Sequence, residues 1–391
     1  MAIGRAGEVA ATAIAAIADT MHVIAAGVGK GIDVYLFLIG MMVLSELARV
    51  QGLFDWLAAK AAVSARGSAT RLFALVYGVG VVVTVFLSND ATAVVLTPAV
   101  AAVTRAANVK QPLPYLYVCA FVANAASFVL PISNPANLVV YGDGLPPLLA
   151  WIPAFALPSL LSIGLTYGVL RWTQRRALWQ PVAEEVKVPC LSRPGKAAAV
   201  GIAVTALVLM VASGLGIRLG LPTCVAAMMT LSVVCLMLRS SPWPYIRAVS
   251  WGVLALVAFL FVLVELLDRW GVIHAAGEFL HAYAERSMTL TAMVSGVAVG
   301  LGSNIINNLP AGLMAGTMLH LAALGPRMAG ALLVGVDLGP NLSVSGSLAT
   351  LLWLAALRRD GIRITSWDFF KVGLWVMPPA LLGALAGLWM T

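Results

Sequence analysis

The chain has 391 residues, of which 61% are hydrophobic and only 10% are charged, and its formal net charge is +8. Soluble domains carry about 25% charged residues, so this composition excludes an ordinary soluble globule. The basic residues form no stripe with interleaved aromatic residues, which excludes a typical nucleic-acid-binding surface. The four cysteines have no paired spacing that would indicate a disulfide framework or a zinc site. We therefore predict a polytopic membrane protein, and no sequence motif indicates a cofactor or a metal.

Residues 1–30 form an alanine-rich stretch that is interrupted by Glu8, Asp19 and His22. We expect an amphipathic or poorly anchored segment here, and neither a membrane span nor a cleavable signal peptide. Eight later stretches are apolar and reach the length of about 20 residues that a helix needs to cross a bilayer. They cover residues 32–50, 113–141, 147–170, 197–217, 221–238, 248–267, 326–357 and 368–390.

Two further apolar stretches, 71–107 and 287–322, are each interrupted at the middle by a polar cluster. Each stretch predicts a helical hairpin that enters the membrane and returns on the same side. Polar, proline and glycine residues also interrupt 113–141 and 326–357, which indicates broken transmembrane helices. The predicted fold class is an all-α polytopic membrane protein with two re-entrant helical hairpins and two broken transmembrane helices.

The positive charges predict an orientation in the membrane. If the basic loop 171–196 is cytoplasmic, 18 of the 24 lysines and arginines lie on the cytoplasmic side. This asymmetry is what the positive-inside rule requires. We therefore expect a multi-pass protein of the cell (inner) membrane with both termini outside.

The two halves of the sequence resemble each other in order along the chain. In the orientation above, the two copies start from opposite sides of the membrane, so the repeat is inverted, as in many secondary transporters. Three matches have an offset of 219 residues and one has an offset of 213, namely 44–47 with 263–266, 52–53 with 271–272, 88–89 with 307–308, and 134–138 with 347–351. The predicted organisation is an N-terminal segment 1–30, a first repeat 31–170, a cytoplasmic linker plus helix pair 171–247, and a second repeat 248–391.

Four polar clusters lie inside the apolar stretches, at 86–92, 130–137, 303–310 and 337–350. Unwound backbone inside a membrane is tolerated only around a protein-lined or wet cavity, and matching breaks in two repeats indicate a transporter binding site. For any single residue the alternative is an ordinary bond between helices, or for Asp90 a helix cap. We predict a substrate site formed by Ser88, Asn89, Asp90, Thr92, Ser133, Asn134, Asn137, Asn307, Asn308, Asn341, Ser347 and Thr350.

The residue types in these clusters limit the substrate. None of the clusters contains a lysine or an arginine, so a multiply charged anion has no counter-charge beyond helix N-termini. Amides and hydroxyls dominate, which favours a small, polar, largely uncharged solute or a cation coordinated by carbonyl groups.

Carboxylates inside a membrane are costly and indicate function. Asp90 is predicted at a helix N-terminus, whose dipole favours the charged carboxylate, whereas Asp337 is predicted to end a half-helix, where the dipole favours the neutral acid. Both are candidates for proton coupling, with Asp337 as the proton carrier and Asp90 as the fixed charge. Glu46 and Glu265 occupy equivalent repeat positions near span ends, and we expect them to bond structurally to neighbouring backbone. His320 is expected to be structural.

The same segments resemble a known family. Residues 86–98 are similar to the first hairpin motif of the arsenical-pump membrane proteins (ArsB family) of the ion transporter superfamily, and 307–310 resemble the second. Residues 335–341 with 346–353 are very similar to that family's C-terminal signature, and the resemblance covers about 31–391.

The resemblance implies a secondary transporter, not an enzyme, that exports trivalent arsenite and antimonite in exchange for protons, with an optional soluble ATPase partner. It places the substrate against Asn89, Asp90, Asn134, Asn137, Asn307, Asn308, Ser347 and Thr350. Arsenous acid is a neutral trihydroxide near pH 7, so amides and hydroxyls suit it. Cys119 is the only thiol in a span that bears a cluster, and one thiol cannot form a three-sulfur site.

Two alternatives remain open. The first is a Na⁺/H⁺ antiporter or an organic-anion transporter of the same superfamily, which sodium dependence would favour. The second is a membrane-embedded aspartyl protease that uses Asp90 and Asp337. The chain has neither an HExxH nor a Gly-x-Gly-Asp motif, and proteolysis would leave the repeat unexplained.

Overall fold

The fold is known from a computed structural model that describes residues 21, 24–184, 186–322 and 324–391. These residues are mostly helical and form no β-strand beyond one isolated bridge between Ser68 and Pro181. The predicted N-terminal segment lies outside the described residues apart from Met21 and its last part, the helix Ile24–Lys30. The all-α fold class is confirmed.

The first repeat proceeds from a long helix and a short one to a hairpin, a broken helix and a final long helix. Within the hairpin, one turn has the rare π-helical form, which is often found at functional sites. The elements are α2 (Ile32–Val50), α3 (Leu53–Ala65), α4 (Ala69–Phe86), α5 (Asn89–Ala91), η1 (Thr92–Leu96), α6 (Thr97–Ala106), α7 (Leu113–Ala125), η2 (Pro131–Ser133), α8 (Pro135–Tyr141), η3 (Gly142–Gly144) and α9 (Leu148–Gln174).

A helix pair and a short helix join the two repeats, and the second repeat then follows the order of the first. The joining elements are α10 (Arg193–Gly214), α11 (Gly220–Leu238) and α12 (Trp243–Arg247). The second repeat consists of α13 (Trp251–Arg269), α14 (Val272–Arg286), α15 (Met288–Ile306), α16 (Asn308–Leu321), α17 (Pro326–Leu338), η4 (Gly339–Asn341), η5 (Val344–Gly346), α18 (Leu348–Arg359) and α19 (Ser366–Gly387).

The repeat extends to the residues that start and stop the helices. Gly52 and Gly271, 219 positions apart, both have positive φ angles, of 73° and 75°, and precede α3 and α14. Ser68 and Ser287, at the same spacing, cap the first hairpin helices, α4 and α15, by accepting a hydrogen bond from a backbone amide. The second halves of the two broken helices, α8 and α18, begin 213 positions apart. Equivalent local chemistry therefore produces equivalent elements.

Besides the short α12, two longer helices of the structure were not predicted. The helices α3 and α14 have 13 and 15 residues and connect the first span of each repeat to its hairpin. Both are too short and too polar for a search for apolar stretches of about 20 residues. Asp55 and Lys60 lie within α3, for example.

A count of membrane spans by helix length and composition selects a different set of helices from the sequence prediction. Among the described residues, seven helices could cross a membrane, or eight if α2 and the helix before it, bent by 51°, form one span. This count includes the hairpin helices α4 and α15, and it omits both broken helices because their halves are short. The predicted spans at 113–141 and 326–357 correspond instead to α7 with α8 and α17 with α18.

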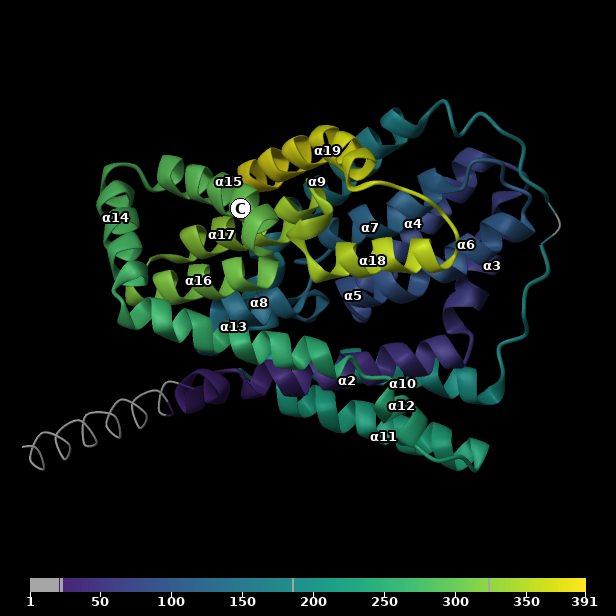
Figure 1. Cartoon of the computed structure of the whole chain (residues 1–391), viewed down its shortest axis with the longest axis horizontal. Helices are drawn as coiled ribbons and strands as arrows, with labels where there is room; N and C mark the ends of the chain where they lie inside the picture. Colours follow the sequence, from purple (N-terminus) through teal and green to yellow (C-terminus); the bar gives the residue numbers. More distant parts are fainter. Residues whose placement is uncertain (1–20, 22–23, 185, 323) are drawn as a thin grey trace, which may run out of the picture.

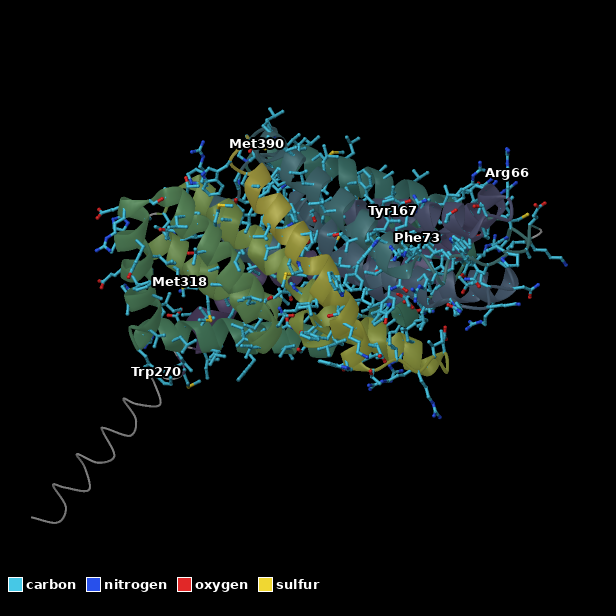
Figure 2. The ribbon with its side chains drawn as sticks, turned by 90° about the horizontal axis from the view of Figure 1, so that it is seen from above. Arg66, Phe73, Tyr167, Trp270, Met318 and Met390 are labelled. Carbon is cyan, nitrogen blue, oxygen red and sulfur yellow. The ribbon has the colours of Figure 1, made fainter. Side chains whose placement is uncertain are left out.

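The hairpins and broken helices form the middle of the molecule. Figure 1 shows α9 and α19 along one side of them and α2, α10, α11 and α13 along the other. Each hairpin packs against the second half of the other repeat's broken helix: α16 contacts α8, and η1 with α6 contacts α18. Figure 2 places Arg66 and Trp270 at opposite ends of the long axis.

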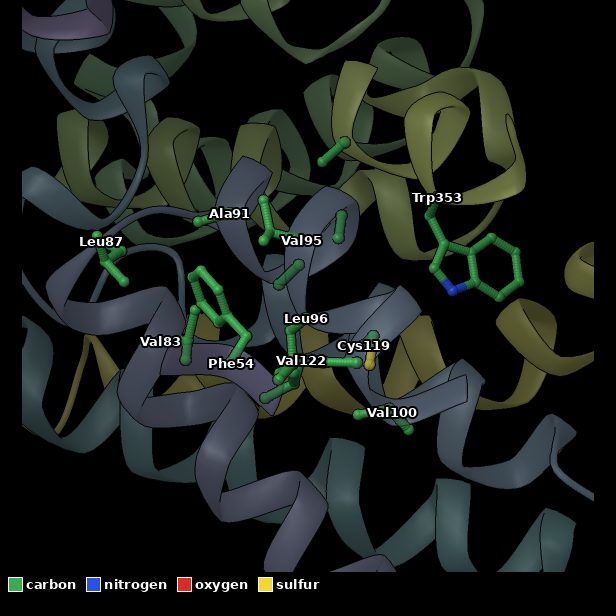
Figure 3. Packing of buried hydrophobic residues seen from close by; sticks show 14 of the residues in the cluster. Phe54, Val83, Leu87, Ala91, Val95, Leu96, Val100, Cys119, Val122 and Trp353 are labelled. Atoms are coloured by element: carbon green, nitrogen blue, oxygen red, sulfur yellow. The ribbon is translucent and has the colours of Figure 1, made fainter. Parts of the chain in front are cut away.

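The first hairpin is embedded in an apolar cluster that draws on both repeats. Figure 3 shows Leu96 of this hairpin near Val122 of α7, with Trp353 of α18 close by. The Trp353 side chain is fully buried, and its indole Nε1 donates a hydrogen bond of 2.9 Å to the Leu116 carbonyl. The apolar packing holds the polar tip of the hairpin in a fixed position.

A line of glycines brings α15 and α17 into close contact. A Cβ atom on Gly335 would overlap with the carbonyl group of Gly296, and a Cβ on Gly300 would lie 3.2 Å from the Gly335 carbonyl oxygen. Small residues allow such close approach between membrane helices. This contact fixes the end of α17, where Asp337 lies.

We expect Gly335→Ala to destabilise the protein by about 1–3 kcal/mol, because the added methyl group has no space. Gly302→Ala is the matched control, since a Cβ on Gly302 meets no atom within 4 Å. In the control, the higher helix propensity of alanine should leave stability unchanged or raised. Thermal unfolding of the two purified variants tests this, and equal midpoints would contradict the packing role of Gly335.

Candidate functional site

A narrow cleft lies where the tips of both hairpins meet the breaks of both broken helices. Its cavity volume is about 10 Å³, which is close to the space that one water molecule needs. A larger solute therefore requires the cleft to widen. The lining residues are Leu38, Asn89, Asp90, Asn134, Pro135, Val253, Asn308, Leu309, Ser347, Leu348 and Ala349.

The hairpin tips are shaped by side chains that cap the helix after each turn. In the first hairpin, Ser88 Oγ accepts a hydrogen bond of 3.2 Å from the Ala91 amide. In the second, Asn307 has φ and ψ angles of 76° and 155°, a strained conformation that residues other than glycine rarely adopt, and its Oδ1 accepts from the Leu309 amide. These caps set Asn89 and Asn308 at the cleft, where both are buried.

The breaks of α7–α8 and α17–α18 are built in the same way. Asn134 and Ser347 are extended residues at the N-caps of α8 and α18, where their side chains accept hydrogen bonds from the Ala136 and Thr350 amides. The N-termini of α5, α8, α16 and α18 thus all adjoin the cleft. Their unpaired amides give it a partial positive potential.

Asp337 lies behind the cleft and is fully buried in the last turn of α17, where the sequence predicted the end of a half-helix. Ser127 Oγ donates to its Oδ2 at 2.6 Å, and Asn134 Nδ2 donates to its Oδ1 at 2.7 Å. Both donors come from the other repeat. Asn134 therefore contacts the cleft, caps α8 and binds Asp337 at the same time.

A second pair of hydrogen bonds joins the broken helices of the two repeats. Asn124 Nδ2 donates a hydrogen bond of 3.0 Å to Asn341 Oδ1, and Asn341 Nδ2 donates to the Phe121 carbonyl at 3.1 Å. Asn124 precedes Asp337 by 213 positions, so an amide and a carboxyl group occupy equivalent places in the two repeats. The site has symmetric helices but asymmetric charge.

Several polar groups at the cleft have unused hydrogen-bonding capacity. Among the described residues, no group donates to the Asp90 carboxylate, and the Asn308 side chain makes no hydrogen bond. Asn89 uses its Oδ1, which accepts from the Asp90 amide at 2.9 Å, but not its Nδ2. Buried polar groups in proteins are nearly always paired, so these are suited to a solute.

We expect Asp90→Asn to reduce transport without lowering the thermal unfolding midpoint. The half-buried carboxylate has no donor to lose among the described residues, and neutralising it removes a charge from an apolar setting. Transport and unfolding measured on the same preparation test this. A lower midpoint would show that Asp90 is structural instead.

The other predicted site residues surround the cleft without lining it. They hold its backbone by hydrogen bonds: Thr92 with Thr84 at 2.8 Å, Ser133 to the Val85 carbonyl at 3.1 Å, and Thr350 to the Val344 carbonyl at 2.8 Å. Asn137 Nδ2 donates to three carbonyls of the first break, and Asn307 Nδ2 donates to the Ser345 carbonyl. The residues in this supporting shell are Ser88, Thr92, Ser133, Asn137, Asn307, Asn341 and Thr350.

Four residues of the site lie outside the four predicted polar clusters. Leu38 and Val253 form apolar walls of the cleft, while Asn124 and Ser127 lie in the α7–α8 region. Nothing in the sequence separates the first two from other apolar residues. The 213-residue offset, extended backwards from the break, would have paired Asn124 with Asp337.

The two repeat-related glutamates differ from expectation in their partners. Glu46 accepts two hydrogen bonds, of 2.7 and 2.6 Å, from Arg49, and Glu265 accepts one of 2.6 Å from Lys30. The expected bonds to neighbouring backbone are therefore replaced by ion pairs, because long basic side chains lie within reach at the span ends. His320 is exposed near the end of α16.

Comparison with known proteins places the chain in a family. The citrate transporter family (CitMHS) matches residues 3–338. Arsenical pump membrane proteins of Yersinia enterocolitica and Escherichia coli are 26% and 25% identical, each over 90% of this chain and 84% of the relative. A transporter of Mycobacterium tuberculosis is 27% identical over 92% of this chain and 86% of its own. These relatives confirm the resemblance to arsenical pumps.

The fold also has a counterpart among solved structures. The YdaH transporter of Alcanivorax borkumensis, described as having an unusual topology, matches with a TM-score of 0.60 and 16% identity. The match covers 94% of this chain and 87% of that one. This structure shows the fold alone. By the family match over residues 3–338 the chain belongs to the citrate transporter family, and with its relatives it is a multi-span membrane permease of the ion transporter superfamily.

Proposed function

We propose that this permease exports trivalent arsenite and antimonite across the cell membrane in exchange for protons. The observation that carries the proposal is the lining of the cleft: amides, a hydroxyl, one carboxylate and apolar side chains, with no lysine or arginine among the lining residues that the structure describes. A neutral trihydroxide can exchange hydrogen bonds with such groups. Sequence similarity to arsenical pumps supports this substrate class.

Thiol coordination is not part of the proposal. Cys119 is fully buried in α7 and does not line the cleft. Hydrogen bonds to Asn89, Asn308 and Ser347 would hold the solute weakly enough for release on the other side.

Proton coupling is proposed to act through Asp337 and Asn134. When Asp337 is a carboxylate, it accepts hydrogen bonds from Asn134 and Ser127. A proton on Oδ2 would donate to the Ser127 hydroxyl, whose own hydrogen can go to the Asn124 carbonyl at 2.7 Å. The bond from Asn134 would then be made to a neutral acid and would weaken. Because Asn134 also lines the cleft, solute binding and protonation would influence each other.

Transport further requires the cleft to open toward each side. With a cavity volume of about 10 Å³, the site is closed around a space too small for arsenous acid. We propose that the hairpins and broken helices move, by rocking or as an elevator, against α2 and α13, which supply the apolar walls Leu38 and Val253. By the charge distribution, both termini face outward, and a soluble ATPase is an optional partner.

Reconstitution into sealed vesicles with an acidic lumen tests the proposal. Proton efflux should drive arsenite into the lumen above its external concentration, and a protonophore should abolish this accumulation. Arsenite entry no faster than in protein-free vesicles would overturn the proposed function. Growth of a metalloid-sensitive strain on arsenite, with and without the protein, provides the test in cells.

An organic anion is the second candidate substrate. The family match to citrate transporters favours it, as do the four helix N-termini beside the cleft. Labelled citrate in the same vesicles, with and without sodium, separates the two proposals. Sodium-dependent citrate uptake without arsenite transport would establish the second one.

A further inference from the structure

A second cavity, of about 350 Å³, lies between the end of α9 and the first turns of α19. It shares no lining residue with the cleft. Its volume is within the range of small-molecule sites. Three of its eight lining residues are basic, and two are tryptophans. The lining residues are Trp172, Thr173, Gln174, Arg175, Arg176, Lys371, Val372 and Trp375.

The two arginines of this cavity have no acidic partner among the described residues. Arg175 and Arg176 are exposed and form no ion pair with any described carboxylate, and the Arg175 guanidinium lies 5.2 Å from the Trp172 ring centre. Lys371 forms an ion pair with Asp368, with 3.7 Å between its Nζ and the Asp368 Oδ1. That carboxylate already accepts hydrogen bonds from the Thr365 hydroxyl, at 2.6 Å, and the Thr365 amide. The cavity therefore has an excess of positive charge.

The position of the cavity matches the boundary of a membrane. The helices α9 and α19 lie side by side and antiparallel, since Gly387 approaches Pro158 while Trp375 packs against Trp172 at 5.7 Å between ring centres. The apolar part of α9 ends at this level, and the two tryptophan rings are about half exposed, at 49% and 58%. Tryptophans at span ends mark the headgroup level.

We propose that this cavity binds an anionic phosphate group at the membrane surface. Two neighbouring guanidiniums can each form paired hydrogen bonds with phosphate oxygens, and Lys371 adds a third positive charge. Basic pockets between membrane helices on the cytoplasmic side bind lipid headgroups in this way. The cavity adjoins the loop 171–196, which the charges predict to be cytoplasmic. The phosphate can belong to an anionic phospholipid or to a soluble phosphate ester.

Native mass spectrometry of the full chain in detergent tests the proposal. Added phosphatidylglycerol should be retained, and phosphatidylcholine should not. The variant R175Q/R176Q/K371Q should lose phosphatidylglycerol binding by about a hundredfold, because each of the three basic residues at a membrane surface contributes about a factor of five. The variant K187Q/R193Q/K196Q is the matched control, since it removes three exposed basic residues outside the cavity and should bind as the wild type does.

Two further measurements make the outcome decisive. The variant R175K/R176K keeps the charge but loses the planar forks, and it should bind more weakly than the wild type while folding normally. Glycerol phosphate or inorganic phosphate is then added as a competitor. Displacement of the lipid supports a site for free phosphate, and retention supports a lipid site. Equal retention of both lipids, or unchanged binding in the triple cavity variant, would overturn the proposal.

Discussion

Replacing Asp337 by asparagine is expected to reduce proton-driven arsenite accumulation to the level of protein-free vesicles. Asparagine has the same shape but carries no exchangeable carboxyl proton, so the coupling step proposed for this residue cannot occur. Exchange of arsenite across the membrane without a proton gradient should persist, because Asp337 does not line the cleft. The measurement is accumulation with an imposed gradient, compared with exchange at equal pH.

The Asp337→Asn variant is expected to fold. Its amide nitrogen can face the Ser127 hydroxyl, which is able to accept, while its oxygen still accepts from Asn134. Glu46→Gln is the matched control, since this glutamate is paired with Arg49 at a span end and should not affect coupling. Accumulation that still follows the gradient in Asp337→Asn would contradict its role as the proton carrier.

The second large effect is expected for Asn134→Ser. Serine occupies the equivalent N-cap in the second repeat, at Ser347, so it should preserve the cap of α8. The shorter side chain should lose the 2.7 Å hydrogen bond to Asp337 and its contact with the cleft. We expect arsenite transport to fall strongly. The free energy of unfolding should fall by about 1.5–3 kcal/mol, which is the contribution of a hydrogen bond to a charged group.

Two variants separate the three roles of Asn134. Asn134→Ala also removes the helix cap, so its unfolding midpoint should lie below that of Asn134→Ser. Ser127→Ala removes the other donor to Asp337 but leaves the cleft intact, and it should affect proton dependence more than arsenite affinity. Initial rates at varied arsenite and pH provide the comparison. Wild-type kinetics in Asn134→Ser would exclude a link between cleft and carboxyl group.

The sequence was informative about the hairpins and the breaks for a physical reason. Polar residues and prolines in an apolar stretch are costly in a membrane, so their clusters mark places where the helix must stop. Of the predicted site residues, the structure brings Asn89, Asp90, Asn134, Asn308 and Ser347 together at one cleft. That they bind substrate stays a prediction.

Other features depend on contacts that no local pattern contains. The bond between Asn134 and Asp337 joins residues 203 positions apart, and it forms only because the two broken helices cross. Leu38 and Val253 resemble any lipid-facing residue until α2 and α13 are placed beside the hairpin tips. The repeat symmetry of Glu46 and Glu265 near the span ends predicts a structural bond for both, but it does not show that Glu46 pairs with the Arg49 side chain.

The exchange of packing between the repeats has a consequence for how the protein is made. Because α16 rests on α8, and η1 and α6 rest on α18, neither repeat can complete its own half of the cleft. During synthesis the first hairpin and α8 lack their packing partners until the second repeat has been inserted. Domains otherwise tend to fold in the order in which they are synthesised. Two fragments divided within residues 175–192 should therefore be inactive singly and regain the site when produced together. Each repeat of this chain therefore depends on the other to complete its fold.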